Sequence, residues 1–298
     1  MNLKLKSNGQ LRVLANVVLA LASLCCIIPF LLLIIASLTD NNEIIKNGYT
    51  FFPKKWSWEA YKYIIGSMDS IVRAYSITIF TTIFGTTLGL IISSMLGYGL
   101  SREDLPGSKV LNFAVLFTLL FNGGLIPTYL VYTQIFHIKN TIWAQIFPGL
   151  LINAFIVFLM RSYFRTSIPP SILESARIDG AKELYIFIKI VLPLALPIIA
   201  TIGLMLGINY WNSWTNGLYY ITDTKYYNIQ NVLNRILLDI RSLNSDFASG
   251  MAGDILARMP SSSIRMAIAI IGVIPLLAIY PFFQRYFIKG ITLGAVKE

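Results

Sequence analysis

The chain has 298 residues, of which 56% are hydrophobic and 13% are charged, and its mean hydropathy is +0.67. Charged residues make up about a quarter of an ordinary soluble domain, so this composition excludes a soluble globule and predicts a protein dissolved in a lipid bilayer. The formal net charge of +10 does not require nucleic acid, because membrane proteins concentrate lysine and arginine in their cytoplasmic loops.

Apolar stretches follow one another along the chain, each long enough to cross the roughly 30 Å hydrocarbon core as a helix. They cover residues 11–38, 71–98, 110–132, 142–162, 194–216 and 262–287. Helices are expected because lipid cannot satisfy free backbone amide and carbonyl groups. The predicted fold class is therefore all-α, a polytopic membrane protein with six transmembrane helices, and residues 1–298 are expected to form a single transmembrane domain.

An even number of spans places both termini on the same side of the membrane. Lys4, Lys6 and Arg12 precede the first span, and the positive-inside rule predicts that they stay in the cytoplasm. The first apolar run is too long for a signal peptide and lacks a clear small-residue cleavage site, so we expect it to remain as an anchor. The sequence thus predicts a multi-pass protein with its N- and C-termini in the cytoplasm.

Two segments on the predicted outer side are longer than ordinary connections. Residues 39–70 contain the aromatic runs Tyr49–Pro53 and Trp56–Trp58, which suit a position at the membrane interface. The polar outer loop at 217–261 contains a predicted helix. Loops of this length often serve a function, and the alternative for 217–261 is a passive linker.

A charged segment interrupts the apolar pattern at residues 163–193, on the predicted cytoplasmic side. Ser171 and Glu174 have the spacing of a capping box, which predicts a helix that begins at Ser171. Gly180 suits the left-handed conformation that ends a helix. A second helix is expected after this glycine, until Pro193 interrupts it. The result is a helix–turn–helix, and its presence between two spans predicts contact with a protein partner.

The residues of this segment form a pattern with fixed spacing. It consists of Glu174-Ser175-Ala176, Asp179-Gly180-Ala181, Phe187, Ile190, Leu192-Pro193-Leu194 and Pro197. The pattern resembles the EAA loop, the coupling loop of the permease subunits of ATP-binding-cassette (ABC) importers. Ser175 stands where that family commonly has alanine, which exchanges one small residue for another.

Other segments are similar to the same family. Asn122–Tyr129 looks like the third span of its sugar-importing branch, and Tyr210–Trp214 looks like the outer end of its fifth span. Pro275–Lys297 is similar to the C-terminus of maltose-type permeases. The resemblance implies the type I ABC importer permease fold and the function of a second permease subunit in carbohydrate uptake, with oligosaccharides from complex polysaccharides as the substrate.

The resemblance also implies a set of partners in the cell membrane of a prokaryote. They are a second homologous permease, two ABC ATPase subunits in the cytoplasm, and an extracellular sugar-binding protein. Because the chain has no phosphate-binding glycine-rich loop with Lys-Ser/Thr, we expect no catalysis and no cofactor in it, with ATP and Mg held by the ATPases. The residues implied to contact the ATPases are Glu174, Ala176, Asp179, Gly180 and Ala181. Glu174 has capping of its own helix as an alternative or additional role.

Polar and aromatic side chains within or beside the spans are candidates for the substrate path, because sugars offer hydroxyls for hydrogen bonds and apolar CH faces for aromatic rings. These candidates are Asn122, Tyr129, Asn153, Asn209, Tyr210, Trp211 and Asn212. The amides equally suit helix–helix contacts. The expected contacts between the outer loop and the binding protein are Asn231, Asn234 and Arg235.

Three alternatives fit the sequence less well. A membrane enzyme needs a histidine cluster or a nucleophile–base pair, whereas His137 is the only histidine, so no catalytic residue and no metal site is expected. An ion-coupled secondary transporter tends to have acidic residues near the midplane, whereas the 14 Asp and Glu residues fall in loops or at span ends. A permease for peptides or other small solutes would share the EAA loop and is the main alternative.

Overall fold

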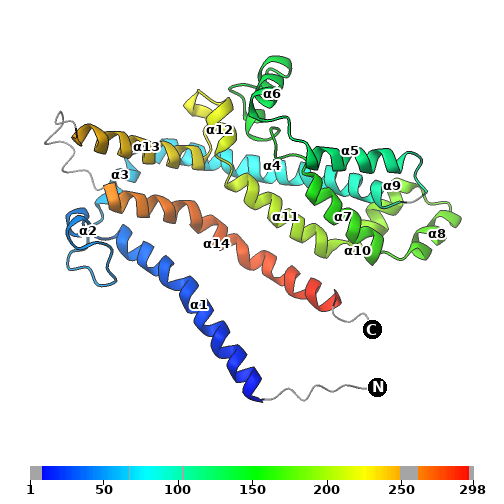
Figure 1. The fold of residues 1–298 in the computed structure, drawn as a ribbon, viewed down its shortest axis with the longest axis horizontal. Coiled ribbons are helices and arrows are strands. Elements are labelled where there is room, and N and C mark those ends of the chain that lie inside the picture. Colours follow the sequence, from blue (N-terminus) through cyan, green and yellow to red (C-terminus); the bar gives the residue numbers. More distant parts are fainter. Residues whose placement is uncertain (1–8, 67, 103, 249–260, 295–298) are drawn as a thin grey trace. The chain divides into compact units, whose positions relative to one another are not determined.

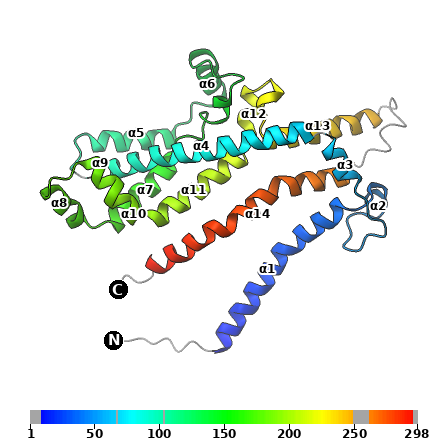
Figure 2. The ribbon, with the colours of Figure 1, turned by 180° about the vertical axis from the view of Figure 1, so that it is seen from behind.

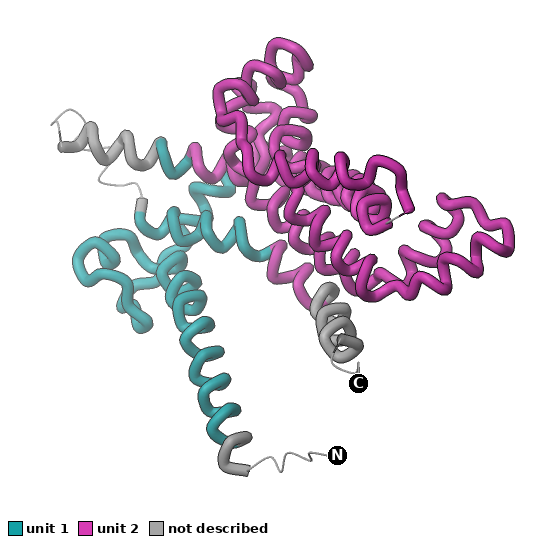
Figure 3. The backbone as a smooth tube through the Cα atoms, turned by 45° about the vertical axis from the view of Figure 1, so that its right-hand side comes forward, with its two compact units in different colours: residues 1–68, 236–274 teal, residues 69–235, 275–298 magenta. Residues whose placement is uncertain are grey.

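The computed structural model describes residues 9–66, 68–102, 104–248 and 261–294, and these are mostly helical, with no β-strand among them. The expected all-α class is therefore confirmed for the described part of the chain. The chain divides into two compact units (Figure 3). The first unit comprises residues 1–68 and 236–274, and the second comprises residues 69–235 and 275–298.

Three of the described helices are long and apolar enough to cross a membrane. They are α1 (Gly9–Ser37), α4 (Met68–Ser101) and α14 (Ser261–Gly294), labelled in Figure 1. Two bent pairs raise the number to five if each pair counts as one span. One pair joins Ser108–Leu120 to Leu125–Ile135 with a bend of 112°, and the other joins Glu183–Leu194 to Leu196–Trp211 with a bend of 84°.

The stretch at 110–132 is not one straight helix. It consists of α5 (Ser108–Leu120), α6 (Leu125–Leu130) and the π-helix η1 (Val131–Ile135). Between α5 and α6, the side-chain oxygen of Asn122 accepts a hydrogen bond from the backbone amide of Gly124 at 2.9 Å. This local bond competes with the helical hydrogen bonds, and consecutive glycines favour the break.

The stretch at 142–162 likewise is not one helix. It begins with the 3-10 turn η2 (Ile142–Gln145), and the helix α7 (Ala154–Ser167) starts only near its end. Pro148 lies between them and has no amide hydrogen for a helix. The side chain of Asn153 then caps α7 by accepting from the backbone amides of Phe155 and Ile156 at 2.9 and 3.4 Å.

The remaining elements are short, apart from α11 and α13. In the order of the chain they are α2 (Asn41–Asn47), α3 (Glu59–Ile65), α8 (Pro170–Ile178), α9 (Glu183–Ile186), the π-helix η3 (Phe187–Val191), α10 (Leu192–Leu194), α11 (Leu196–Trp211), α12 (Thr215–Tyr220), the 3-10 turn η4 (Thr224–Tyr226) and α13 (Ile229–Ala248). The predicted helix of the outer loop corresponds to α13, and residues 249–260 of that loop lie outside the described residues.

One face of α4 is built from small residues and packs closely against α7 and α11 in the second unit (Figures 1 and 2). The buried residues at every fourth position are Thr81, Gly85, Gly89, Ser93 and Gly97. A Cβ atom at Gly97 would lie 2.9 Å from the side chain of Met160, and one at Gly85 would overlap the ring of Tyr210. Small residues at this spacing let helix backbones approach closely in a membrane protein.

The core of the second unit joins this packing to the charged segment. Its buried residues come from α4, α7, α9, η3 and α11 and include Tyr98, Ile156, Met160, Phe164, Ile186, Phe187, Val191, Ile202 and Leu206. The helix–turn–helix is therefore attached to the spans by apolar packing as well as by the chain itself.

The outer segment of the first unit is ordered by carboxylates that accept backbone hydrogen bonds. Both oxygens of Glu43 accept from backbone amides, those of Lys54 and Lys55, at 2.6 Å each. Asp40 caps α2 and pairs with Lys55 at 3.0 Å. Phe52 is 93% exposed on this segment, as expected for an aromatic side chain that meets lipid or a partner.

We predict that Gly85→Ala lowers the stability of the protein because its new methyl group collides with Tyr210. The expected cost is about 1–3 kcal/mol, typical of overpacking a core, measured by thermal unfolding in detergent. Gly99→Ala is the matched control on the same helix, since its nearest neighbour is a Leu105 methyl group at 4.0 Å. Equal stability of the two variants would contradict the close packing of α4 against α11.

Candidate functional site

The helix–turn–helix at 170–194 turns through a Schellman motif. The amide of Ala181 donates to the carbonyl of Ala176 at 3.0 Å, and the amide of Gly180 donates to that of Arg177 at 2.9 Å. These are the two bonds that define this helix ending. Gly180 has the left-handed φ of +81° that the motif requires, in agreement with the sequence prediction.

Helix α8 begins at Pro170, one residue before the predicted start at Ser171. Pro169 occupies the N-cap position and makes no side-chain cap bond, so the predicted capping box between Ser171 and Glu174 is wrong. Proline is preorganised for the first helical position, where its missing amide costs nothing. The carboxylate of Glu174 is consequently not used as a cap, and its side chain is exposed.

The residues predicted to contact an ATPase occupy two surfaces of the turn. Glu174 lines a pocket of about 430 Å³ together with Arg102, Asp104 and Arg177. The other four residues line a more open hollow of about 530 Å³, and they are Ala176, Asp179, Gly180 and Ala181. The two alanines are half-buried and pack against the core, whereas the aspartate and the glycine are exposed. The structure therefore brings four of the five residues together around one hollow.

A closed set of ion pairs fixes the start of α9. The carboxylate of Glu183 accepts from Nη1 of Arg102 at 2.7 Å and from Nε of Arg177 at 2.9 Å. Arg102 also pairs with Asp104, and Nη1 of Arg177 lies 3.4 Å from the carboxylate of Asp104. We call these four side chains, which alternate in charge, the charged ring. They come from the loop after α4, from α8 and from α9.

Arg102 is the most enclosed member of the charged ring, with only 14% of its side chain exposed. It donates to the hydroxyl of Tyr98 at 3.1 Å, and that hydroxyl donates to Glu183 at 3.3 Å. The hydrogen bond from Arg102 lowers the pKa of Asp104 to about 2. Because this pKa is lowered, the stability that the ionised carboxylate contributes is complete above its ordinary pKa near 4, so Asp104 stays charged at neutral pH. Sequence analysis missed this ring because its members share no motif.

The candidates for the substrate path are divided between structural and exposed positions. Asn122 and Asn153 bond to the backbone at helix ends, and the buried hydroxyl of Tyr210 donates to the carbonyl of Ile146 at 3.1 Å. Trp211 is also buried, at 3% exposure. Asn209 and Asn212 are exposed, as are Asn122 and Asn153. Tyr129 is half-buried, and its ring stacks on that of Tyr220 with 5.5 Å between centroids.

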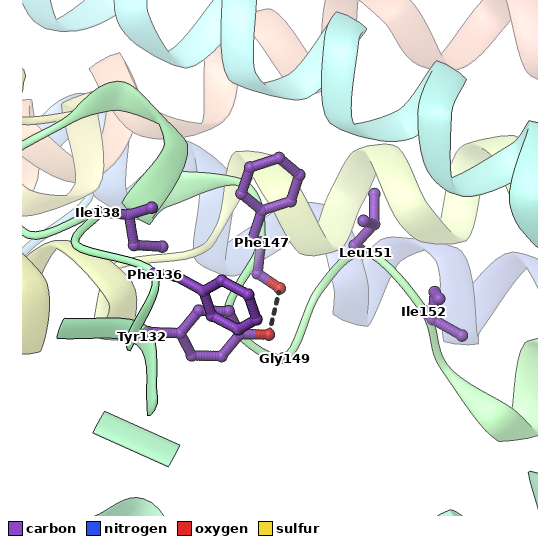
Figure 4. A pocket seen from close by; sticks show the side chains of 7 residues that line it. All are labelled: Tyr132, Phe136, Ile138, Phe147, Gly149, Leu151 and Ile152. Carbon is purple, nitrogen blue, oxygen red and sulfur yellow. Dashed lines mark hydrogen bonds between the residues drawn. The ribbon is translucent and has the colours of Figure 1, made fainter. Parts of the chain in front are cut away.

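An aromatic pocket of about 510 Å³ lies between η1 and the segment before α7 (Figure 4). It is lined by Tyr132, Phe136, Ile138, Phe147, Gly149, Leu151 and Ile152. The hydroxyl of Tyr132 donates to the carbonyl of Phe147 at 3.5 Å. Its side chains lack the amides and charged groups that would bind sugar hydroxyls, so this pocket is better suited to an apolar group than to a carbohydrate.

The base of the outer loop is fixed by a cluster of buried amides, Gln145, Asn228 and Asn231, which we call the amide cluster. Gln145 donates to Asn231 and accepts from Asn228, each at 3.3 Å. Asn231 also donates to the carbonyl of Trp214 at 2.6 Å. Asn231 is buried at 7% exposure, and its side chain makes internal hydrogen bonds. Arg235 is exposed and Asn234 is partly exposed.

Comparisons with known proteins agree on one family. The family described as "Binding-protein-dependent transport system inner membrane component" matches residues 105–293. The polygalacturonan/rhamnogalacturonan transport system permease protein YtcP of Bacillus subtilis is 39% identical to this chain. The match covers 94% of this chain and 95% of the length of YtcP. The arabinooligosaccharides transport system permease protein AraQ of Halalkalibacterium halodurans is 28% identical to this chain. That match covers 99% of this chain and 100% of the length of AraQ.

A solved structure shows a similar fold. It is a chain of a bacterial ABC transporter involved in the import of the acidic polysaccharide alginate. The TM-score is 0.79 with 29% sequence identity, and the match covers 96% of this chain and 100% of that chain.

We predict that Asn231→Ala destabilises the protein by about 1–3 kcal/mol, because it removes the buried hydrogen bonds of the Asn231 side chain to Gln145 and to the carbonyl of Trp214. Thermal unfolding of the purified protein in detergent measures the change. Arg235→Ala, one turn further along α13 and exposed, is expected to stay within about 0.5 kcal/mol. If Asn231→Ala proved as stable as Arg235→Ala, the amide cluster would not fix the loop.

Proposed function

Because the chain belongs to the family of binding-protein-dependent transport system inner membrane components, we propose that it is a transmembrane permease subunit of an ATP-driven carbohydrate importer. The observation that carries this proposal is the match to a named sugar-transport permease at 39% identity over nearly the full length of both chains. The solved alginate importer adds the same fold over 96% of this chain. A permease of a related importer for peptides or other small solutes is the alternative.

The proposed topology has six spans, with both termini in the cytoplasm of a prokaryotic cell. Three are the long helices α1, α4 and α14, and two are the bent pairs. Residues 142–167 supply the remaining span, in which η2 and the irregular segment precede α7. Irregular backbone at membrane depth is tolerated where protein buries it or a water-filled cavity adjoins it, which suits the segments that line a transport path.

The helix–turn–helix is proposed to dock on an ATPase subunit. Its exposed carboxylates Glu174 and Asp179 offer acceptors for basic side chains, and Gly180 allows the corner to enter a cleft without a side chain in the way. The half-buried Ala176 and Ala181 keep the corner rigid through the Schellman bonds and the core. A rigid corner transmits the displacement of the ATPases to the helices, and ATP and Mg belong to those partners.

The substrate is proposed to be an oligosaccharide, delivered by an external binding protein and passed between this chain and a second, homologous permease. The exposed Asn209 and Asn212 and the half-buried Tyr129 are the side chains available for hydroxyl and stacking contacts. The other two aromatic candidates, Tyr210 and Trp211, are buried. Arg235 and Asn234, on the part of the outer loop nearest the amide cluster, are the proposed contacts with the binding protein.

We predict that Glu174→Lys leaves the protein inserted but uncouples transport from ATP hydrolysis, because it reverses the charge at the proposed ATPase contact. Sugar uptake should fall at least about tenfold, as expected for loss of about 1.4 kcal/mol or more at an interface, while membrane abundance stays normal. Glu59→Lys makes the same charge change in the first turn of α3, on the predicted outer side, and should transport normally. Normal uptake by Glu174→Lys would rule out this contact.

The substrate class is tested on the external protein that docks on this permease. Isothermal titration of that protein with a panel of neutral and acidic oligosaccharides, together with short peptides as controls, should give micromolar or tighter binding for a carbohydrate only. Selective binding of a peptide would establish the alternative substrate class while leaving the assignment as an importer permease intact.

A further inference from the structure

We infer that the charged ring makes α4 a second connection between the helix–turn–helix and the spans, with Arg102 and Glu183 as positioning residues for coupling. The inference rests on the proposed function. It adds a specific route by which movement of the ATPases reaches the helices that form the transport path.

The covalent route from the turn into the spans is interrupted several times. After α9 the chain passes through the π-helix η3, and the helix breaks again at Ala195, where the axis bends by 84° into α11. Pro193 lies in this stretch and cannot donate a helical hydrogen bond. Breaks of these kinds are the usual places where helices bend, so a push on the turn is absorbed in part before it reaches α11.

The charged ring bypasses those breaks. Arg102 directly follows the last residue of α4, and its guanidinium reaches Glu183 at the first position of α9 at 2.7 Å. The bond from the Tyr98 hydroxyl to the same carboxylate starts within the last turn of α4. The Tyr98 ring also packs on Phe187, with 5.3 Å between centroids. Both polar and apolar contacts thus attach the second helix of the turn to α4.

Helix α4 is suited to carry movement over a long distance. It is continuous over 34 residues and contains no proline, which corresponds to a length of about 50 Å. Toward its other end, the buried hydroxyl of Thr78 accepts from the amide of Ile229 at 2.8 Å. Ile229 begins α13 and lies next to Asn228 of the amide cluster. The same helix therefore touches the base of the outer loop and the coupling turn.

Coupling between two sites is established by a measured interaction, not by a chain of contacts alone. The test uses the complete purified transporter, with both permeases and the ATPases, in lipid nanodiscs. The measured quantity is the ratio of ATPase activity with saturating sugar-loaded binding protein to the basal activity. The variants are Arg102→Gln, Glu183→Gln and the double variant, and the control is Lys55→Gln, which removes the pair between Lys55 and Asp40 in the first unit.

The expected result is a fall of about fivefold in this ratio for each single variant, the lower end of typical coupling between sites. The double variant should be no worse than either single one, because both remove the same bond. Complexes should co-purify in normal proportions, and Lys55→Gln should match the wild type. A purely structural role would lower yield or stability without changing the ratio in the complexes that do assemble.

An unchanged ratio in both single variants, or additive losses in the double variant, would overturn the inference. If Arg102→Gln fails to assemble, Tyr98→Phe replaces it. That change removes the hydroxyl that bonds to Arg102 and Glu183 and keeps the aromatic packing on Phe187. An unchanged ratio of ATPase activities in Tyr98→Phe would equally overturn the inference. If the sugar-loaded binding protein does not raise the ATPase activity of the wild-type complex, the proposed function itself is refuted. Failure of the inference and failure of the proposed function are therefore distinguishable.

Discussion

The close approach of α7 and α11 to the small-residue face of α4 is the constraint on which the second unit depends. A Cβ atom at Gly85 would collide with Tyr210, and one at Gly97 would come too close to Met160, so these neighbours would have to shift outward. Such a shift would disturb the bond from Tyr210 to the carbonyl of Ile146 and the edge contact of Phe164 of α7 with Tyr98, at 6.2 Å between ring centroids. The geometry of the charged ring thus depends on packing that begins about one turn away at Gly97 and continues along α4 to Gly85.

Polar groups play a different part at each end of this packed region. At the base of the outer loop, the amide cluster is almost completely buried and its bonds are directed to backbone carbonyls and to one another. At the helix–turn–helix, the polar groups are charged and more exposed, and they join separate elements. Neutral amides suit the enclosed position because they cost less to bury than charges do, whereas ion pairs suit a position that water can reach.

Sequence analysis predicted the features that depend on local composition. Apolar length located α1, α4 and α14, and the glycine of the EAA pattern located the corner at Gly180. Length alone failed at 110–132 and 142–162, because Asn122 and Pro148 interrupt helices while a single such residue lowers the mean hydropathy of a long apolar stretch only slightly. It also could not show that Asn231 is buried, since an asparagine on an amphipathic helix looks the same on either face. The charged ring joins Arg102 to residues about eighty positions away, and no motif in a single sequence marks such a pair.

The π-helix η3 has a consequence for how this loop can change during evolution. A π-helical turn holds one residue more than an α-helical turn, so deleting one residue from Phe187–Val191 would restore regular α-helix and leave Glu183 at nearly the same rotation about the helix axis. A deletion within the α-helical residues 184–186 would instead rotate Glu183 by roughly 100°, and its carboxylate would then face away from Arg102 although every residue of the EAA pattern is unchanged. This loop therefore accommodates a loss of one residue in η3 more easily than in α9.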